Sequence, residues 1–262
     1  MPYDDRLVKV KVLADRKVAV MTLENPPLNL LDREMALEIP RMLHALDGDD
    51  AVRVIVLRGS GEKAFSAGAD VSEFPQARED ASHSLLIEAN KAVDAFEQVS
   101  KPVIAAMEGY VLGGGCEIAL ACDIRILGKT GRIGCPEINL GIFPIYGGLF
   151  RLAQCIGLSR AYEMLYTGDS IDADTALSYG LVSHVVPAGT AEDAAVQLAA
   201  RIAEKPVEAV KMIKRGVREL LETASASRFS KNVAYSHAVF STQDCAEGVE
   251  AFLKKRKPSF QK

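Results

Sequence analysis

The sequence contains few of the residues that mark metal sites or disulfide frameworks. Its 262 residues include no tryptophan, five cysteines and four histidines. The cysteines show no Cys-x-x-Cys spacing, and the histidines show no spacing typical of a metal site or a catalytic triad. We therefore expect reduced thiols, a cytoplasmic-type compartment and no bound metal.

Long apolar runs and an excess of basic charge are also missing. No apolar run reaches the roughly 18 residues that span a bilayer, and the first residues contain no apolar signal core. The formal net charge is −4 at pH 7, and Lys and Arg are dispersed except in the run Lys254–Lys257. We expect a soluble cytoplasmic protein whose partners include neither nucleic acid nor a membrane.

What is present is enough apolar sequence, 48% of the chain, for one large core. Residues 7–13 and 17–23 are rich in β-branched and apolar side chains and predict a hairpin. Residues 32–46 predict a helix that Pro40 should kink or split, and residues 52–57 predict a further strand. The order strand, strand, helix, strand indicates a mixed α/β fold.

The segment 84–99 has the pattern of an amphipathic helix, which returns the chain to a strand at 101–107. Its polar positions are expected mostly to face solvent. They are Glu88, Asn90, Lys91, Asp94, Glu97 and Gln98.

From Thr190 onward the sequence predicts only helices, broken at Pro206 and near residues 225–227. Their apolar positions suit packing on a neighbouring subunit better than closing a core alone. We predict a core of residues 1–190 and a C-terminal helical oligomerisation region of residues 191–262.

Three consecutive glycines precede an acid in Gly113-Gly-Gly-Cys-Glu117, between the strand at 101–107 and a segment of helical composition. Glycine has no Cβ, so another group can approach this backbone closely. The start of a helix also offers unpaired N–H groups and the positive end of the helix dipole. The stretch is suited to binding an oxygen that carries negative charge, although tight strand-to-helix packing would require the same glycines.

Two further segments join this glycine turn to form a recognisable set. They are Phe65-Ser-Ala-Gly-Ala-Asp70, and Pro136-Glu137 ahead of Gly141. In this order and spacing the segments resemble the crotonase (enoyl-CoA hydratase/isomerase) superfamily, and the resemblance covers nearly the whole chain. It implies a spiral of repeated strand-strand-helix units, a helical C-terminal region, and homotrimers that usually pair as hexamers.

The resemblance also implies roles for individual residues. The backbone N–H groups of Ala69 and Gly114 would form an oxyanion hole for an acyl-CoA thioester. Glu117 would activate water and Glu137 would supply a proton, so that water adds across the 2,3 double bond of an enoyl-CoA. Isomerases of the family commonly keep only one such carboxylate. The presence of both favours a hydratase.

A site for CoA follows from the same resemblance, with CoA as part of the substrate and no separate cofactor. The short side chain of Asp70, which lies in a tight turn, is also suited to accept a local hydrogen bond. Lysines that the family often carries in an early loop and after the Ala-Asp-hydrophobic triplet are replaced here by Asn25–Asn29 and Ser72. The implied CoA-binding residues are Ala67, Ala69, Asp70, Val71, Phe252 and Lys255.

Alternatives remain open at this level. An isomerase, or another acyl-CoA lyase or hydrolase, would share the oxyanion hole, and a noncatalytic binding member would share the fold. Ile145 and Tyr146 stand where typical hydratases have a smaller, more glycine-rich turn, so a reshaped acyl pocket is expected. The Pro-Pro-Leu-Asn segment ending at Asn29 resembles that of hydratases of cyclic dienoyl-CoA esters.

Overall fold

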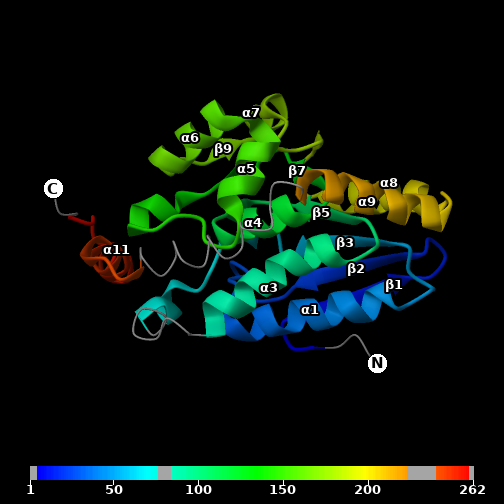
Figure 1. Cartoon of the computed structure of the whole chain (residues 1–262), viewed down its shortest axis with the longest axis horizontal. Helices are drawn as coiled ribbons and strands as arrows, with labels where there is room; N and C mark the ends of the chain where they lie inside the picture. The colour runs from blue at the N-terminus through cyan, green and yellow to red at the C-terminus, as the bar shows by residue number, and fades with distance from the viewer. Residues whose placement is uncertain (1–4, 76–83, 223–239, 260–262) are drawn as a thin grey trace.

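Two β-sheets lie at the centre of the fold (Figure 1). The computed structural model describes residues 5–75, 84–222 and 240–259. The larger sheet has the order β1-β2-β3-β5-β7-β10 and the smaller has the order β4-β6-β8-β9. The strands are β1 (Val8–Leu13), β2 (Val18–Leu23), β3 (Val54–Gly59), β4 (Ala64–Ser66), β5 (Val103–Met107), β6 (Tyr110–Leu112), β7 (Ile124–Gly128), β8 (Arg132–Gly134), β9 (Ile171–Asp172) and β10 (His184–Val186).

From β3 to β8, successive strands alternate between the two sheets, which confirms the expected repeat. The pairs β3–β4, β5–β6 and β7–β8 each place one strand in each sheet and are then followed by a helix. The helices are α1 (Arg33–Asp47), α3 (Ser84–Gln98), α4 (Gly114–Ala121), α5 (Gly148–Ile156), α6 (Leu158–Thr167), α7 (Ala173–Tyr179), α8 (Ala191–Ala203), α9 (Val207–Glu222) and α11 (Gln243–Leu253), with 3-10 turns η1 (Val71–Glu73) and η2 (Pro136–Leu140).

In the smaller sheet, β4, β6 and β8 are parallel neighbours. The carboxyl ends of parallel strands meet at the same edge of a sheet, where α/β folds commonly bind their ligands. The segments that follow these strands are residues 67–70, 113–117 and 135–137. Each contains a residue singled out from the sequence, so the topology brings the three segments together.

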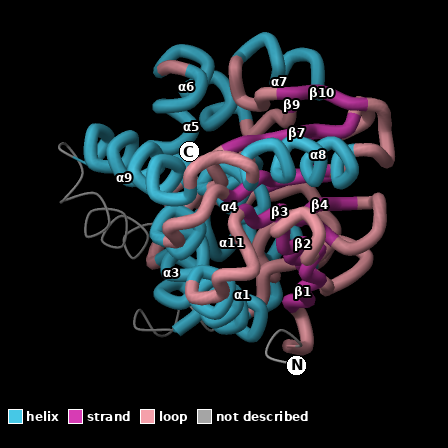
Figure 2. Tube along the Cα trace, turned by 90° about the vertical axis from the view of Figure 1, so that its right-hand side faces the viewer, coloured by secondary structure: helices cyan, strands magenta, loops and turns pink. Residues whose placement is uncertain are grey.

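Alternate side chains of the larger sheet pack on opposite faces, as the period of a strand requires. Along β3, Ile55 and Leu57 belong to a cluster with α1 and α3, whereas Val54 and Val56 belong to a second cluster with α8. Figure 2 shows α8 beside the strands at a distance from α1 and α3. Both faces of this sheet are therefore covered by helices of the same chain.

The regular elements described in the C-terminal part are all helices, and α8 ends before Pro206 while α9 begins after it, as predicted. The predicted break at residues 225–227 lies outside the described residues. Since α8 buries Ala195 and Ala199 on the sheet, this helix contributes to the core. A boundary at residue 190 stays a prediction. None of the helices described here has the length and hydrophobicity to cross a membrane.

The first helix differs from the sequence expectation. Asp32 is its N-cap as predicted and accepts a hydrogen bond from the N–H of Met35 at 2.8 Å. Pro40, however, lies inside one continuous helix. Buried residues flank the proline on both sides, among them Ile39 and Leu43, and their packing on the core holds the helix together. The helix is therefore not split at Pro40, and the alternative expectation of a kink stays a prediction.

The polar side of α3 is also less exposed than expected. Lys91 is exposed, as predicted, but Asn90 is buried, with 5% of its surface exposed. Asp94 and Glu97 turn toward Arg151 on α5 and form ion pairs with it. The expectation of a solvent-facing position is wrong for Asn90, and Asp94 and Glu97 are half-buried, because α3 packs against α1 and α4 and pairs with α5.

A buried asparagine fixes the loop that leads to the first candidate segment. The Nδ2 of Asn29 donates to the carbonyl oxygens of Ser60 and Ala64 at 3.0 and 2.8 Å. The next residues continue the attachment, because the N–H of Leu31 donates to the oxygen of Gly68 at 2.9 Å. These hydrogen bonds fix the position of residues 67–70 relative to the loop that contains Asn29 and Leu31.

Candidate active site

One cavity of about 620 Å³ lies at the carboxyl edge of the smaller sheet. It is bounded by the start of α4, by η1 and η2, and by the end of α11. All of the site residues proposed from the sequence line it except Lys255. Those that do are Ala67, Ala69, Asp70, Val71, Gly114, Glu117, Glu137 and Phe252.

The glycine run lets the start of α4 approach its neighbours. A Cβ on Gly115 would lie 2.3 Å from the oxygen of Ser66, which no side chain tolerates. Gly113 has φ of 54°, and a Cβ there would lie 3.1 Å from Oε1 of Glu137. Close packing and space for an acidic side chain therefore both depend on these glycines.

The N–H groups of Ala69 and Gly114 lie near each other at the cavity wall. A Cβ built on Gly114 would be 3.5 Å from the nitrogen of Ala69, and one built on Gly68 would be 3.3 Å from the nitrogen of Gly114. No hydrogen bond between described residues uses either N–H. Two unused donors that meet beside one cavity are the arrangement required to bind an oxyanion.

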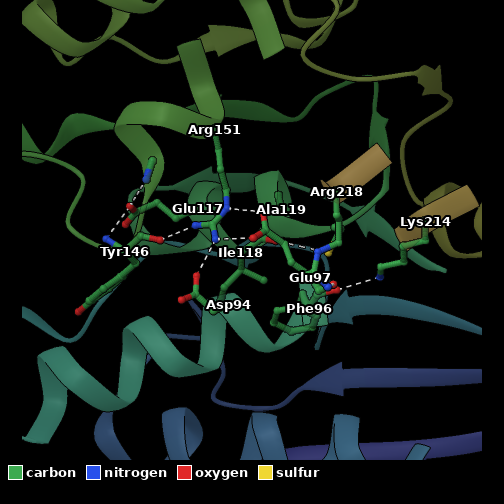
Figure 3. Close-up of polar contacts among 12 residues, drawn as sticks. Asp94, Phe96, Glu97, Glu117, Ile118, Ala119, Tyr146, Arg151, Lys214 and Arg218 are labelled. Carbon is green, nitrogen blue, oxygen red and sulfur yellow. Dashed lines mark hydrogen bonds and ion pairs between the residues drawn. The ribbon is translucent and has the colours of Figure 1, made fainter. Parts of the chain in front are cut away.

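Glu117 is buried at the start of α4 and is held through one of its two oxygens (Figure 3). Oε1 accepts hydrogen bonds from the N–H groups of Tyr146 and Gly148, both at 2.7 Å. A Cβ on Gly148 would lie 2.9 Å from that same oxygen. Oε2 has no hydrogen-bond partner among the described residues. This second oxygen is available to a water or a substrate.

Glu137 supplies the second carboxyl group from η2. It too is buried, and its Oε2 has no hydrogen-bond partner in the described parts of the chain. Burial raises the pKa of Glu117 to about 7, against the opposing effect of its backbone hydrogen bonds and of Arg151. Burial, together with the charge of Glu117, raises the pKa of Glu137 well above its usual range. The site therefore favours one negative charge on the pair Glu117 and Glu137 over a charge on each of them.

Ile145 and Tyr146 line the cavity, in agreement with the expectation that they shape it. The ring of Tyr146 packs against α4, where a Cβ on Gly114 would lie 3.2 Å from Cε2. Its hydroxyl is buried without a partner among the described residues, and burial raises its pKa. An aromatic ring therefore stands beside the two free N–H groups.

The other residues proposed from the sequence fall into two groups. Asp70 caps η1, with Oδ1 accepting the N–H of Ser72 at 3.0 Å, so its local acceptor role is confirmed. Phe252 reaches the cavity from α11, whereas Lys255 follows that helix and is exposed. In the described ranges, no three acidic, histidine or cysteine side chains are grouped so as to bind a metal.

Arg151 belongs to the surroundings of the site, although no motif in the sequence indicates it. Its guanidinium donates to the carbonyl oxygen of Tyr146, next to the N–H that binds Glu117. The available signal is an arginine between apolar neighbours, Phe150 and Leu152, in a segment otherwise suited to a core. Such a charge is buried only when it is paired.

Comparison with known proteins agrees with this geometry. The family model described as enoyl-CoA hydratase/isomerase matches residues 14–262. A short-chain-enoyl-CoA hydratase of Clostridium acetobutylicum is 39% identical over 246 residues, which cover 92% of this chain and 93% of the relative. A crotonyl-CoA hydratase of Syntrophomonas wolfei is 37% identical over 94% of this chain and 95% of its own.

Solved structures agree as well. The structure of an enoyl-CoA hydratase from Mycobacterium avium subsp. paratuberculosis matches with a TM-score of 0.86 and 25% identity, over 99% of this chain and 100% of that chain. One from Bacillus anthracis matches with a TM-score of 0.79 and 33% identity, over 97% and 99%. Sequence, fold and cavity thus lead to one conclusion: the chain belongs to the enoyl-CoA hydratase/isomerase family.

Proposed function

We propose that the protein is an enoyl-CoA hydratase, which adds water across the 2,3 double bond of an enoyl-CoA thioester. The observation that carries the proposal is the pair of buried carboxyl groups, Glu117 and Glu137, each with one unpartnered oxygen at a cavity that also contains two unused backbone N–H groups. The names of the relatives in Clostridium and Syntrophomonas support it.

In the proposed reaction the thioester oxygen accepts hydrogen bonds from the N–H groups of Ala69 and Gly114. Glu117, as the carboxylate, takes a proton from water while the water oxygen bonds to C3. The electron pair of the double bond moves toward the thioester, whose oxygen gains negative charge that the two donors stabilise. Glu137 then delivers its proton to C2. Water is consumed, and one proton passes to Glu117 as another leaves Glu137.

The different surroundings of the two acids support this division of roles. Glu117 has two backbone donors and a nearby arginine, which favour its charged form, whereas for Glu137 burial and a neighbouring carboxylate favour the neutral form. Pairs of acids whose surroundings separate their pKa values commonly divide the work of base and acid. An isomerase needs a single proton shuttle, so the second buried carboxyl group argues for the hydratase.

Replacing either acid with its amide tests the roles. Glu117→Gln and Glu137→Gln should each lower hydration of a 2-enoyl-CoA by about 10²–10⁴-fold, the usual effect of losing a general acid or base. The double variant should be little worse than either single one, because residues that act as a unit are not additive. Steady-state hydration assays measure the rates of the single and double variants. Calorimetry of acyl-CoA binding is the control.

An isomerase would give a different result. One of the two substitutions would abolish migration of the double bond while the other had little effect, and the unaltered protein would add no water to a 2-enoyl-CoA. That result would reject the hydratase and leave the fold assignment in place.

The pH profile provides an independent test. The base must be ionised, so kcat/KM should rise as pH increases through about 7, the pKa of Glu117. The acid must keep its proton, so kcat/KM should fall again at the higher pH where Glu137 ionises, since its pKa lies well above the usual range. A rate that stays constant from about pH 5 to pH 9 would contradict these roles.

The CoA contacts inferred from the resemblance remain part of the proposal. Residues 67–71 and Phe252 line the cavity, which supports their role, while Lys255 lies outside the lining. If Lys255 binds a phosphate, Lys255→Ala should raise KM for acyl-CoA with little change in kcat, as expected for the loss of uniform binding. Lys257→Ala, which alters another exposed lysine of the run, is the control. An unchanged KM would remove Lys255 from the site.

We also propose that the chain forms homotrimers or dimers of trimers. Large apolar side chains are exposed on α9, including Met212, Ile213 and Val217, and on α6, including Leu158 and Tyr166. Surfaces of this kind commonly bind another protein chain. Light scattering should therefore give the mass of a trimer or hexamer. A stable monomer at micromolar concentration would contradict the proposed trimer.

The location that we propose for the protein is the cytoplasm. The free thiols of all five cysteines support it.

A further inference from the structure

A single buried guanidinium connects α3 to the turn that holds Glu117 (Figure 3). The side chain of Arg151 is only 4% exposed. Its Nε donates to Oε1 of Glu97 and its Nη2 to Oδ1 of Asp94, both at 2.7 Å. The remaining nitrogen, Nη1, donates to the carbonyl oxygen of Tyr146, also at 2.7 Å. The ion pairs therefore aim one N–H group at the turn.

The turn at residues 146–148 presents its polar groups in two directions. The carbonyl of Tyr146 faces Arg151, while the N–H groups of Tyr146 and Gly148 face Oε1 of Glu117. Gly147 between them has φ of 95°, and a Cβ there would lie 2.2 Å from Nη1 of Arg151. Only glycine allows the guanidinium to come this close to the backbone. Arg151 and Glu117 thus hold the same short turn from opposite sides.

Holding the turn determines which oxygen of Glu117 can react. Two donors at 2.7 Å occupy Oε1, and Oε2 is left without a partner among the described residues. If the turn moved, both donors would move with it, and the carboxyl group could rotate. A misplacement of about 1 Å in a catalytic group is enough to cost about 10²-fold in rate.

We propose that Arg151 is a positioning residue for Glu117, which clamps the turn at residues 146–148 so that Oε1 is held and Oε2 is presented to water. The inference rests on the proposed hydratase function. Arg151 contacts the carbonyl of the turn and not the carboxyl group, so it acts through Tyr146 and Gly148.

The charges around Glu117 allow this role to be separated from ordinary stabilisation. The positive charge of Arg151 lowers the pKa of Glu117 against the larger effect of burial. Asp94 and Glu97 partly neutralise that positive charge from α3. Other ionisable groups near Glu117 and Arg151 in the described part of the chain include Glu137 of η2, the hydroxyl of Tyr146 with Glu73 near it, and the thiol of Cys135 with that of Cys116. Arg218 of α9 also lies there, and its Nη1 donates to the backbone oxygen of Glu97.

Two substitutions on opposite sides of the ion pair should therefore shift the pH profile in opposite directions. Arg151→Gln removes the positive charge, so the lower midpoint of kcat/KM should rise by about one pH unit. Glu97→Gln leaves Arg151 less neutralised, so that midpoint should fall. In Arg151→Gln, kcat should also drop by about 10–10²-fold, with KM for acyl-CoA little changed.

Arg151→Lys tests geometry apart from charge. Lysine keeps the positive charge but lacks the planar fork that bridges two carboxylates and a carbonyl. We expect kcat to fall as in Arg151→Gln, with a smaller shift of the midpoint. Normal kcat in Arg151→Lys would overturn the proposed clamp.

A second buried cation provides the matched control. Lys214 of α9 donates to the backbone oxygens of Phe96 and Lys101, both at 3.0 Å, and to Oδ2 of Asp123 at 2.9 Å. None of these hydrogen bonds, which join described residues, involves the turn at residues 146–148. Lys214→Gln should lower the melting temperature, as Arg151→Gln does, but leave the pH midpoint unchanged. If Lys214→Gln and Arg151→Gln shift the pH midpoint by the same amount, or if neither shifts it, the positioning role of Arg151 is overturned.

Failure of the hydratase proposal can be recognised separately. If the unaltered protein adds no water to enoyl-CoA esters, infrared difference spectra still report the ionisation of Glu117, with Glu117→Gln identifying its band. Opposite shifts of that band in Arg151→Gln and Glu97→Gln would support the inference without any activity. If Arg151→Gln does not fold, Glu97→Gln and Arg151→Lys carry the test, and an unshifted Glu117 in both overturns the proposal.

Discussion

Close approach of backbones at the start of α4 is the constraint on which the site depends. Gly113, Gly114 and Gly115 leave room for Ser66 on one side and Glu137 on another, and nothing larger than hydrogen fits at Gly115. With any side chain at that position, the loop at residues 67–70 would be pushed away from α4. The two free N–H groups would then separate, and no single oxygen could reach both.

The second requirement is to keep two carboxyl groups buried next to each other. Burial disfavours the charge on both, and each disfavours the charge on the other. The structure responds unequally, because two backbone donors of another segment and Arg151 favour the charge on Glu117, whereas Glu137 has its own backbone N–H and the neighbouring charge of Glu117. The asymmetry lets one acid carry charge while its neighbour stays neutral. A buried group of charged side chains is stable when each charge has a partner. Here the buried guanidinium of Arg151 is paired with the carboxylates of Asp94 and Glu97.

Much of this could be predicted from local sequence. The N-cap at Asp32, the glycine run and the strand pattern each reflect the chemistry of a few adjacent residues. The continuous helix at Pro40 and the burial of Asn90 could not be predicted in this way. Each depends on segments that are distant in the sequence and pack against it. The same holds for Arg151, whose two carboxylate partners, Glu97 and Asp94, lie 54 and 57 residues away. Contacts over such separations are set by topology, which a motif does not encode.

The alternation of strands between two sheets has a consequence for how such a site can change. Ala69 follows β4, Gly114 and Glu117 follow β6, and Glu137 follows β8, so three successive repeats together deliver the two N–H donors and the two acids to a common edge. Glu137 lies on a segment that carries neither of the two donors, so this acid can be replaced without changing the residues whose N–H groups face the cavity. Glu117 projects as a side chain from the helix that begins at Gly114, so it too can be substituted while the backbone N–H groups stay in place. The pair of donors can thus be kept while the acids differ, and one scaffold can support different chemistry.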